Sequence, residues 1–342
     1  MQNQDQNACH LASASHQTSQ GNCLQPTPTI TLLADPQVIG VDYFFQDLAR
    51  IDYAHPVEIP QRLSEKHFDI LLVRSTTALT HAIAHSGVTF VGSCVTGTDH
   101  IDFTAFQEPI PHLFTAEGCN SLAVLAYIQN ILIPLKLPKS SRVGILGVGR
   151  IGSRVLELFK TQGFEIFTSD PFRQGQPGFC HTPLEHLKNL DLITCHVPLT
   201  RSGPHPTYHR LDQHFFNRQS SQLIFINTSR GDIVSDETLL QLTTQQLILD
   251  VWPHEPHINP DLIQKALLAT PHIAGATPCG LWNGTYQCYL ALCQQFGWPA
   301  LKTIPRKAQD NTHPDLWALS EKFKAKTHNV CDLFQTLRRD NR

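Results

Sequence analysis

The sequence predicts an α/β protein built from two doubly wound parallel sheets. The chain has 342 residues, which exceeds the usual size of a single domain. Strand-like and helix-like stretches alternate in two separate sets, as expected for parallel strands joined by crossover helices. A long apolar helical stretch over 121–135 lies between the two sets, and Pro138 with a polar Lys-Ser-Ser marks the boundary after it.

The first alternating set covers about 29–116. It contains the strand-like segments ITLLAD, FDILLVRS and TFVGSCV, with a helix predicted over about 41–50. A later helix over about 281–296 should return to this domain, so its predicted bounds are 29–116 plus 277–300. Residues 1–28 are rich in Gln and Ser and lack the basic start of a signal or transit peptide, which predicts a disordered extension.

The second alternating set gives a predicted domain over 117–276. Its strand-like segments are RVGILGVG, FEIFTSD, DLITCHVPL, QLIFINTS and QLILDVW, with helices predicted over 151–162 and near 184–190. Strands in this order, with a glycine-rich turn after the first, are typical of a Rossmann-like dinucleotide-binding domain. The first set then predicts a flavodoxin-like substrate domain.

Composition excludes several classes of function. The formal net charge is -3 and charged residues make up 16% of the chain, which gives no electrostatic case for nucleic acid or an anionic membrane. No apolar run reaches the roughly 18 residues that a membrane-spanning helix needs. The ten cysteines form no CxxC pair, so reduced thiols in a cytoplasmic protein are predicted. His81 and His85 lack an acidic or cysteine ligand beside them, and no metal site is predicted.

The motif GVGRIG predicts a dinucleotide site. Gly147 allows the tight turn after the strand, Gly149 lets the backbone approach a pyrophosphate, and Gly152 permits close helix packing. Asp170 ends the next strand, where a carboxylate would bind the adenosine ribose diol and repel a 2'-phosphate. NAD is therefore predicted rather than NADP, although Arg173 lies close by. The alternative is a glycine turn of purely structural use.

Arg230 follows a predicted strand in INTSRGDIV, where the carboxyl end should open onto the cofactor crevice. A guanidinium can hold the carboxylate of a 2-hydroxy or 2-oxo acid by two parallel hydrogen bonds. The alternative is an ordinary surface arginine.

His272, in TPHIAG, is the candidate for proton exchange, because an imidazole can gain or lose a proton near neutral pH. Glu255, in DVWPHEP, could hydrogen-bond that ring, fix its tautomer and favour its protonated form. His254 and His257 flank Glu255 and are alternatives for the same role.

GVGRIG, NTSRG, DVWPHEP and TPHIAG, in this order and within about 30–298, resemble the D-isomer-specific 2-hydroxyacid dehydrogenase family. The resemblance implies Arg230, Glu255 and His272 as catalytic residues. It implies NAD contacts at Gly147, Gly149, Arg150, Ile151, Gly152, Asp170, Asp250 and Gly275. Substrate contacts are implied at Arg74, Ser75, Val95 and Ala276, where Val95 and Ala276 replace a threonine and a tyrosine that would make polar contacts.

Four further segments, VRSTTALT, VGSCVTGTDHID, EGCNSLAV and RSGPHPTYHRLD, resemble a member of the family that acts on a small phosphorylated hydroxy acid. Arg74 is then a phosphate partner, or alternatively a structural arginine paired with Asp99. Other functions left open are a related dehydrogenase for phosphoglycerate or hydroxypyruvate, and a non-catalytic NAD-sensing protein. Residues 301–342 resemble only the start of the family's dimerisation domain, which predicts a possible but weakened homodimer.

Overall fold

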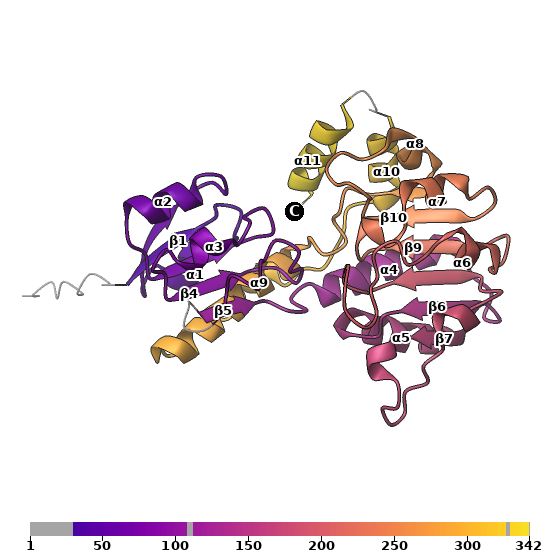
Figure 1. Ribbon diagram of the computed structural model, residues 1–342, viewed down its shortest axis with the longest axis horizontal. Coiled ribbons are helices and arrows are strands. Elements are labelled where there is room, and N and C mark those ends of the chain that lie inside the picture. The colour runs from indigo at the N-terminus through magenta and orange to yellow at the C-terminus, as the bar shows by residue number, and fades with distance from the viewer. Residues whose placement is uncertain (1–29, 108–111, 326–328, 342) are drawn as a thin grey trace, which may run out of the picture.

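The computed structural model describes residues 30–107, 112–325 and 329–341, and these form two lobes, each built on a parallel sheet (Figure 1). The predicted fold class is confirmed. The N-terminal extension predicted over 1–28 lies outside the described residues, and the predicted domain boundaries near 116 and 276 stay predictions.

The first lobe holds a five-stranded sheet in the order β2-β1-β3-β4-β5, the flavodoxin-like order. Its strands are β1 (Thr31–Ala34), β2 (Arg50–Tyr53), β3 (Ile70–Val73), β4 (Phe90–Ser93) and β5 (His112–Thr115). Central strands β3 and β4 are buried throughout, because helices cover both faces. One face packs against α1 (Val41–Phe45) and α9 (Pro278–Phe296), and the other against α2 (Ile59–Glu65) and α3 (His81–Ala84).

The second lobe holds a six-stranded sheet in the order β11-β10-β9-β8-β6-β7. Its strands are β6 (Arg142–Leu146), β7 (Glu165–Ser169), β8 (Leu192–Cys195), β9 (Ile224–Asn227), β10 (Gln246–Leu249) and β11 (Leu268–Ala269). A single parallel bridge between Thr168 and His181 extends the sheet beyond β7. With that bridge as the third segment, the order is that of the Rossmann fold, whose switch point lies between β6 and β8.

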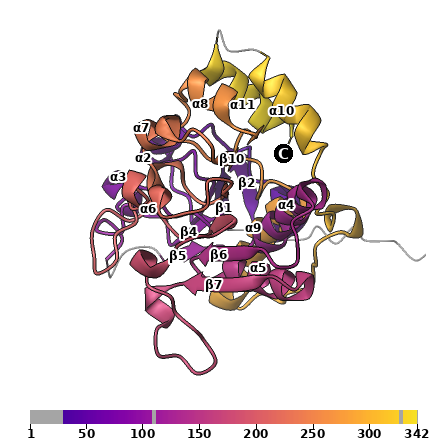
Figure 2. The same cartoon turned by 90° about the vertical axis from the view of Figure 1, so that its right-hand side faces the viewer.

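Helices cover both faces of this sheet (Figure 2). They include α4 (Ser121–Leu135), α5 (Arg150–Gln162), α6 (Gln213–Asn217), α7 (Asp236–Gln241) and α8 (Pro260–Lys265). The helix predicted over 121–135 is confirmed at both ends, and Tyr127 and Ile131 bury its apolar face against the sheet. Two hydrophobic cores result, one on each face.

The C-terminal part of the chain adds α10 (Leu316–Lys324) and α11 (Val330–Asp340) to the second lobe. Phe323 and Phe334 enter its core, where the ring of Phe323 lies 5.8 Å from that of Trp252. The last turn of α11 lies on the side of the second lobe that faces the first lobe (Figure 1). Residues far from the motifs in sequence are thereby brought close to the junction of the two lobes.

Two predicted helices are wrong in extent. The helix predicted over 41–50 ends at Phe45, because residues from Arg50 form edge strand β2, whose mixed polar and apolar residues carry no strong strand pattern. The helix predicted over 184–190 is a single 3-10 turn, Leu184–His186.

Candidate active site

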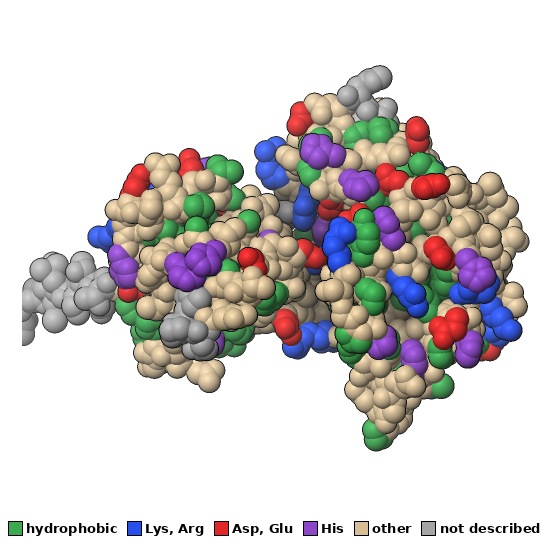
Figure 3. Space-filling view, viewed as in Figure 1, with side chains coloured by type: hydrophobic (Ala, Val, Ile, Leu, Met, Phe, Trp, Pro, Cys, Tyr) green, Lys and Arg blue, Asp and Glu red, His purple; other side chains and the backbone are tan. Residues whose placement is uncertain are grey.

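The predicted site residues gather because every strand pairing in both sheets is parallel, which places the carboxyl ends of neighbouring strands at one edge. In the second lobe, Gly147, Asp170 and Asp250 directly follow β6, β7 and β10. Arg230 and His272 lie three residues beyond the ends of β9 and β11. In the first lobe, Arg74 and Ser75 follow β3, and Val95 lies two residues beyond β4. Charged side chains of both signs lie where the two lobes meet (Figure 3).

The three glycines of the loop each meet a different steric demand. Gly147 has φ +81°, and a Cβ there would lie 2.7 Å from the carbonyl oxygen of His196. A Cβ on Gly152 would lie 2.0 Å from the carbonyl oxygen of Gly147. Gly149 caps α5 and has open space where its Cβ would be, so the amino end of a 13-residue helix faces a space that a pyrophosphate can enter.

Asp170, a further residue of the predicted cofactor site, lies beside a cavity and accepts two backbone hydrogen bonds. Its Oδ2 accepts a hydrogen bond from Val148 N at 2.8 Å, and its Oδ1 accepts one from Phe172 N at 3.2 Å. Beside it lies a cavity of about 640 Å³, lined by residues that include Gly147, Gly149, Asp170, Pro171, His196 and Thr200. The position and size of this cavity suit the adenosine part of a dinucleotide.

Arg173 is held by protein groups. Its Nη1 donates to the carbonyl oxygen of Val148 at 2.8 Å, and its Nε donates to Gln176 at 3.0 Å. The guanidinium also stacks 4.4 Å above the ring of Phe179. Of the other predicted cofactor contacts, Arg150 pairs with Glu117 at 2.8 Å and Ile151 packs against the core.

His272 and Glu255 form the predicted pair. Nδ1 of His272 lies 2.7 Å from Oε2 of Glu255, whose other oxygen accepts a hydrogen bond from Trp252 N at 2.9 Å. Burial alone would raise the pKa of Glu255, but the charge and hydrogen bond of His272, with Arg338 and Trp252 N, lower it overall. His254 is exposed, as is His257, and the charge of His254 acts on Asp236 instead.

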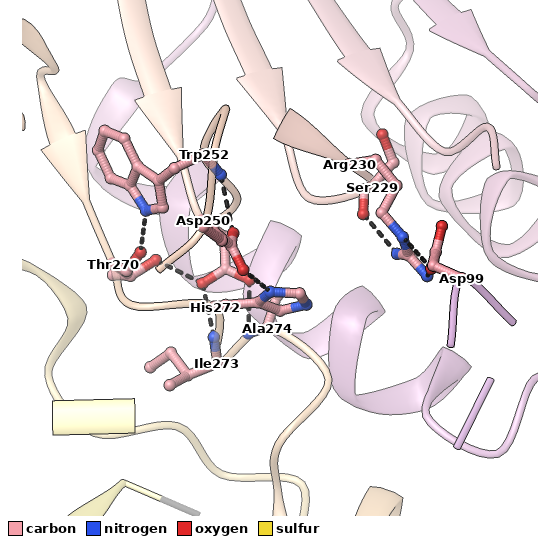
Figure 4. A network of polar contacts seen from close by, with 10 residues as sticks. Asp99, Ser229, Arg230, Asp250, Trp252, Thr270, His272, Ile273 and Ala274 are labelled. Atoms are coloured by element: carbon pink, nitrogen blue, oxygen red, sulfur yellow. Dashed lines mark hydrogen bonds and ion pairs between the residues drawn. The ribbon is translucent and has the colours of Figure 1, made fainter. Parts of the chain in front are cut away.

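Asp250 shapes the loop that carries His272. Its Oδ1 accepts hydrogen bonds from the Thr270 hydroxyl at 2.7 Å and Ile273 N at 2.8 Å, and its Oδ2 accepts one from Ala274 N at 2.9 Å (Figure 4). These bonds hold His272 at φ +55°, an uncommon conformation for a non-glycine residue. Asp250 therefore positions the imidazole, and its predicted contact with NAD stays a prediction. Gly275 follows, where a Cβ would lie 2.2 Å from Nδ2 of Asn120.

Arg230 bridges the two lobes, an interaction that the sequence did not reveal. Its Nε and Nη2 lie 2.7 Å and 2.6 Å from Oδ2 of Asp99, which belongs to the first lobe (Figure 4). Gly97 permits this approach, because a Cβ there would lie 2.1 Å from Nη2 of Arg230. The alternative that Asp99 pairs with Arg74 is wrong, since Asp99 is engaged by Arg230.

The four predicted substrate positions differ in accessibility. Ser75 is exposed and Val95 is partly buried, whereas Ala276 lies in the core of the second lobe. Arg74 is only 8% exposed, and its Nε has no hydrogen-bond partner within the described part of the chain. Burying a guanidinium without a partner costs free energy of folding, so Arg74 is the one of these four residues whose environment calls for a bound anion.

A glycine loop at a helix start, an arginine suited to a carboxylate and an imidazole paired with a carboxylate together define an NAD-dependent dehydrogenase. Residues 129–274 match the model of the D-isomer specific 2-hydroxyacid dehydrogenase, NAD binding domain. The chain belongs to the D-isomer-specific 2-hydroxyacid dehydrogenase family, which confirms the resemblance predicted from its motifs.

The chain is also similar to individual relatives that share one name. A protein of Acinetobacter baylyi named erythronate-4-phosphate dehydrogenase is 36% identical over 285 residues, or 79% of each chain. One of the same name from Pseudomonas aeruginosa is 34% identical over 298 residues, covering 84% of this chain and 77% of the relative. The fold is similar to that of NAD+-bound 3-phosphoglycerate dehydrogenase from Entamoeba histolytica, with a TM-score of 0.62, 20% identity and coverage of 81% and 99%.

Proposed function

We propose that the protein oxidises 4-phospho-D-erythronate to 3-hydroxy-2-oxo-4-phosphooxybutanoate with NAD, a step in the synthesis of pyridoxal phosphate. The observation that carries this proposal is the likeness, over about four fifths of the chain, to relatives named for that activity. The cleft supports it with an arginine for the carboxylate and an acid-base pair for the hydroxyl. The test is NADH formation by the purified protein with this substrate.

In this proposal, each nitrogen of the His272 ring has its own role. When His272 is neutral, its Nδ1–H donates to Glu255 and its Nε2 is left as the acceptor for the substrate's 2-hydroxyl proton. Arg230 holds the carboxylate, which must share or displace the contact with Asp99. The loop of Gly147 and Gly149 would hold NAD, which would supply the hydride acceptor when bound. In the reverse direction His272 returns the proton.

Oxidation should increase with pH and reduction should decrease, because each direction needs the opposite protonation state of His272. Because the pKa of Glu255 is lowered, its charge persists below the ordinary value of 4.5 and is lost only at still lower pH. Glu255→Gln removes that charge, so the rise in oxidation should move to lower pH. A midpoint that stayed in place or rose in this variant would contradict the pairing. Initial rates measured across pH in both directions provide the test.

NAD should be strongly preferred over NADP. The carboxylate of Asp170 beside the cavity would repel a 2'-phosphate, and Arg173 is engaged by Val148, Gln176 and Phe179 rather than free to bind one. The measurement is kcat/KM for each cofactor at limiting concentration. Equal values would show that Asp170 does not contact the ribose.

Two alternatives are separated by the same assay. A related dehydrogenase would be faster with 3-phosphoglycerate or hydroxypyruvate than with 4-phosphoerythronate. An NAD-sensing protein would bind NAD without turnover of any of these acids. The contact of His272 with Glu255 favours catalysis, because a sensor has no need of a paired imidazole beside a carboxylate clamp.

We also propose a cytoplasmic location and a weak homodimer, which stay predictions. Among the described residues, no helix is long and apolar enough to cross a membrane. The described C-terminal helices α10 and α11 pack on the chain's own second lobe. Light scattering over a range of concentrations tests the dimer, and a tight dimer at nanomolar concentration would contradict its weakness.

A further inference from the structure

Arg338 lies on the last turns of α11 and has a buried, unpartnered donor. Its Nε is shielded from solvent and has no hydrogen-bond partner, and its guanidinium forms no ion pair with any residue that the structure describes. Phe334 lies one turn earlier on the same face of the helix, with its ring centroid 5.8 Å from the guanidinium carbon. Because Phe334 is anchored in the core, Arg338 is held on the inner face of α11.

Arg74 approaches the same place from the first lobe. It is 8% exposed, and its Nε likewise lacks a partner among the described residues. Burial lowers the pKa of Arg74, and the positive charge of Arg338 lowers it further, so the two guanidiniums lie within electrostatic reach of each other. Two desolvated cations that repel one another are unfavourable unless an anion binds between them.

The nearby carboxylates are already engaged by other donors. Glu255 and Asp250 act electrostatically on Arg338 from beyond contact distance, because neither forms an ion pair with it. Glu255 is bonded to His272 and Trp252 N, and Asp250 accepts its three bonds from the loop that carries His272. Arg230, which also lies near Arg338, has Asp99 as its partner. Among the described residues, Arg74 and Arg338 are thus two cations at the cleft that have no anion in contact.

We propose that Arg338, from the C-terminal helix, and Arg74, from the first lobe, together bind the phosphate group of the substrate. A phosphate offers three acceptor oxygens to two planar forks of donors, which gives strong charge-assisted hydrogen bonds. Arg230 would then hold the carboxylate at the other end of the acid. The identity of the phosphorylated acid rests on the proposed function, whereas the anion site stands on the two arginines.

Binding of inorganic phosphate to the full chain tests the site without turnover. Calorimetry at constant ionic strength should show that Arg338→Ala raises the Kd of phosphate about ten- to a hundredfold, the effect of losing one charge-assisted hydrogen bond. Arg339→Ala is the matched control, because its side chain is 77% exposed and pairs with Asp340, so its Kd should change less than about twofold. Arg338→Lys keeps the charge but loses the fork, and should fall between the two.

Steady-state kinetics provide a second test of the proposal. Arg338→Ala should lower kcat/KM for 4-phosphoerythronate by a similar factor and change that for erythronate less than about threefold, with an unaltered unfolding temperature. Equal losses with both substrates would overturn the proposal, because Arg338 would then act on Glu255. So would the absence of phosphate binding in the unmodified protein, or an unchanged Kd in Arg338→Ala. If phosphate binding depends on Arg338 but 4-phosphoerythronate is not oxidised, the proposed function fails and the anion site stands.

Discussion

His272→Asn is expected to lower kcat for oxidation by about 10²- to 10⁴-fold, the usual contribution of a positioned general base. The asparagine cannot take the proton of the 2-hydroxyl, while Arg230 still holds the carboxylate, so KM should change little. Asparagine also tolerates the positive φ of this position, which limits the structural disturbance. The measurement is NADH formation under saturating NAD.

His254→Asn is the matched control for this variant. His254 also has a positive φ and lies next to Glu255 in the chain, but its side chain is exposed and its charge acts on Asp236. The control should retain nearly full activity. If it lost as much activity as His272→Asn, or if His272→Asn stayed within tenfold of the unmodified protein, the assignment of the proton to His272 would be wrong.

The sequence was most informative where a local pattern determines the geometry. The glycine loop is an example, because a strand, a turn needing positive φ and a helix start follow one another within a few residues. His272 and Glu255 were also predicted, since each follows a buried strand and parallel strands align their carboxyl ends. Short edge strands such as β2 were missed, because a four-residue strand with partly exposed side chains lacks an apolar pattern.

The interactions that could not be predicted join residues far apart in the chain. Asp99 and Arg230 are 131 residues apart and come from different lobes, so their contact depends on how the lobes are placed. Arg338 lies on a helix whose sequence indicates only an amphipathic surface, and its approach to Arg74 depends on α11 packing back onto the second lobe. Local sequence patterns contain no signal for such contacts.

The second large effect concerns substrate choice. The protein should prefer 4-phosphoerythronate over erythronate by about ten- to ten-thousandfold in kcat/KM, because each charge-assisted hydrogen bond to the phosphate contributes about 1.5 to 3 kcal/mol. The lower part of this range is expected, since the side chains of Val95 and Ala276 have no polar atoms with which to contact the substrate. Arg74→Ala should remove most of the preference. The measurement is kcat/KM for both acids in each variant.

Ser75→Ala provides the comparison, because Ser75 is adjacent to Arg74 but exposed and uncharged. It should reduce the preference much less than Arg74→Ala, since a neutral hydroxyl contributes less to an anion than a guanidinium does. Arg74 is buried, so thermal unfolding must show that Arg74→Ala is folded, and activity with erythronate then serves as an internal reference. Similar kcat/KM for both acids in the unmodified protein would exclude the phosphate site and leave the roles proposed for Arg230 and His272 unaffected.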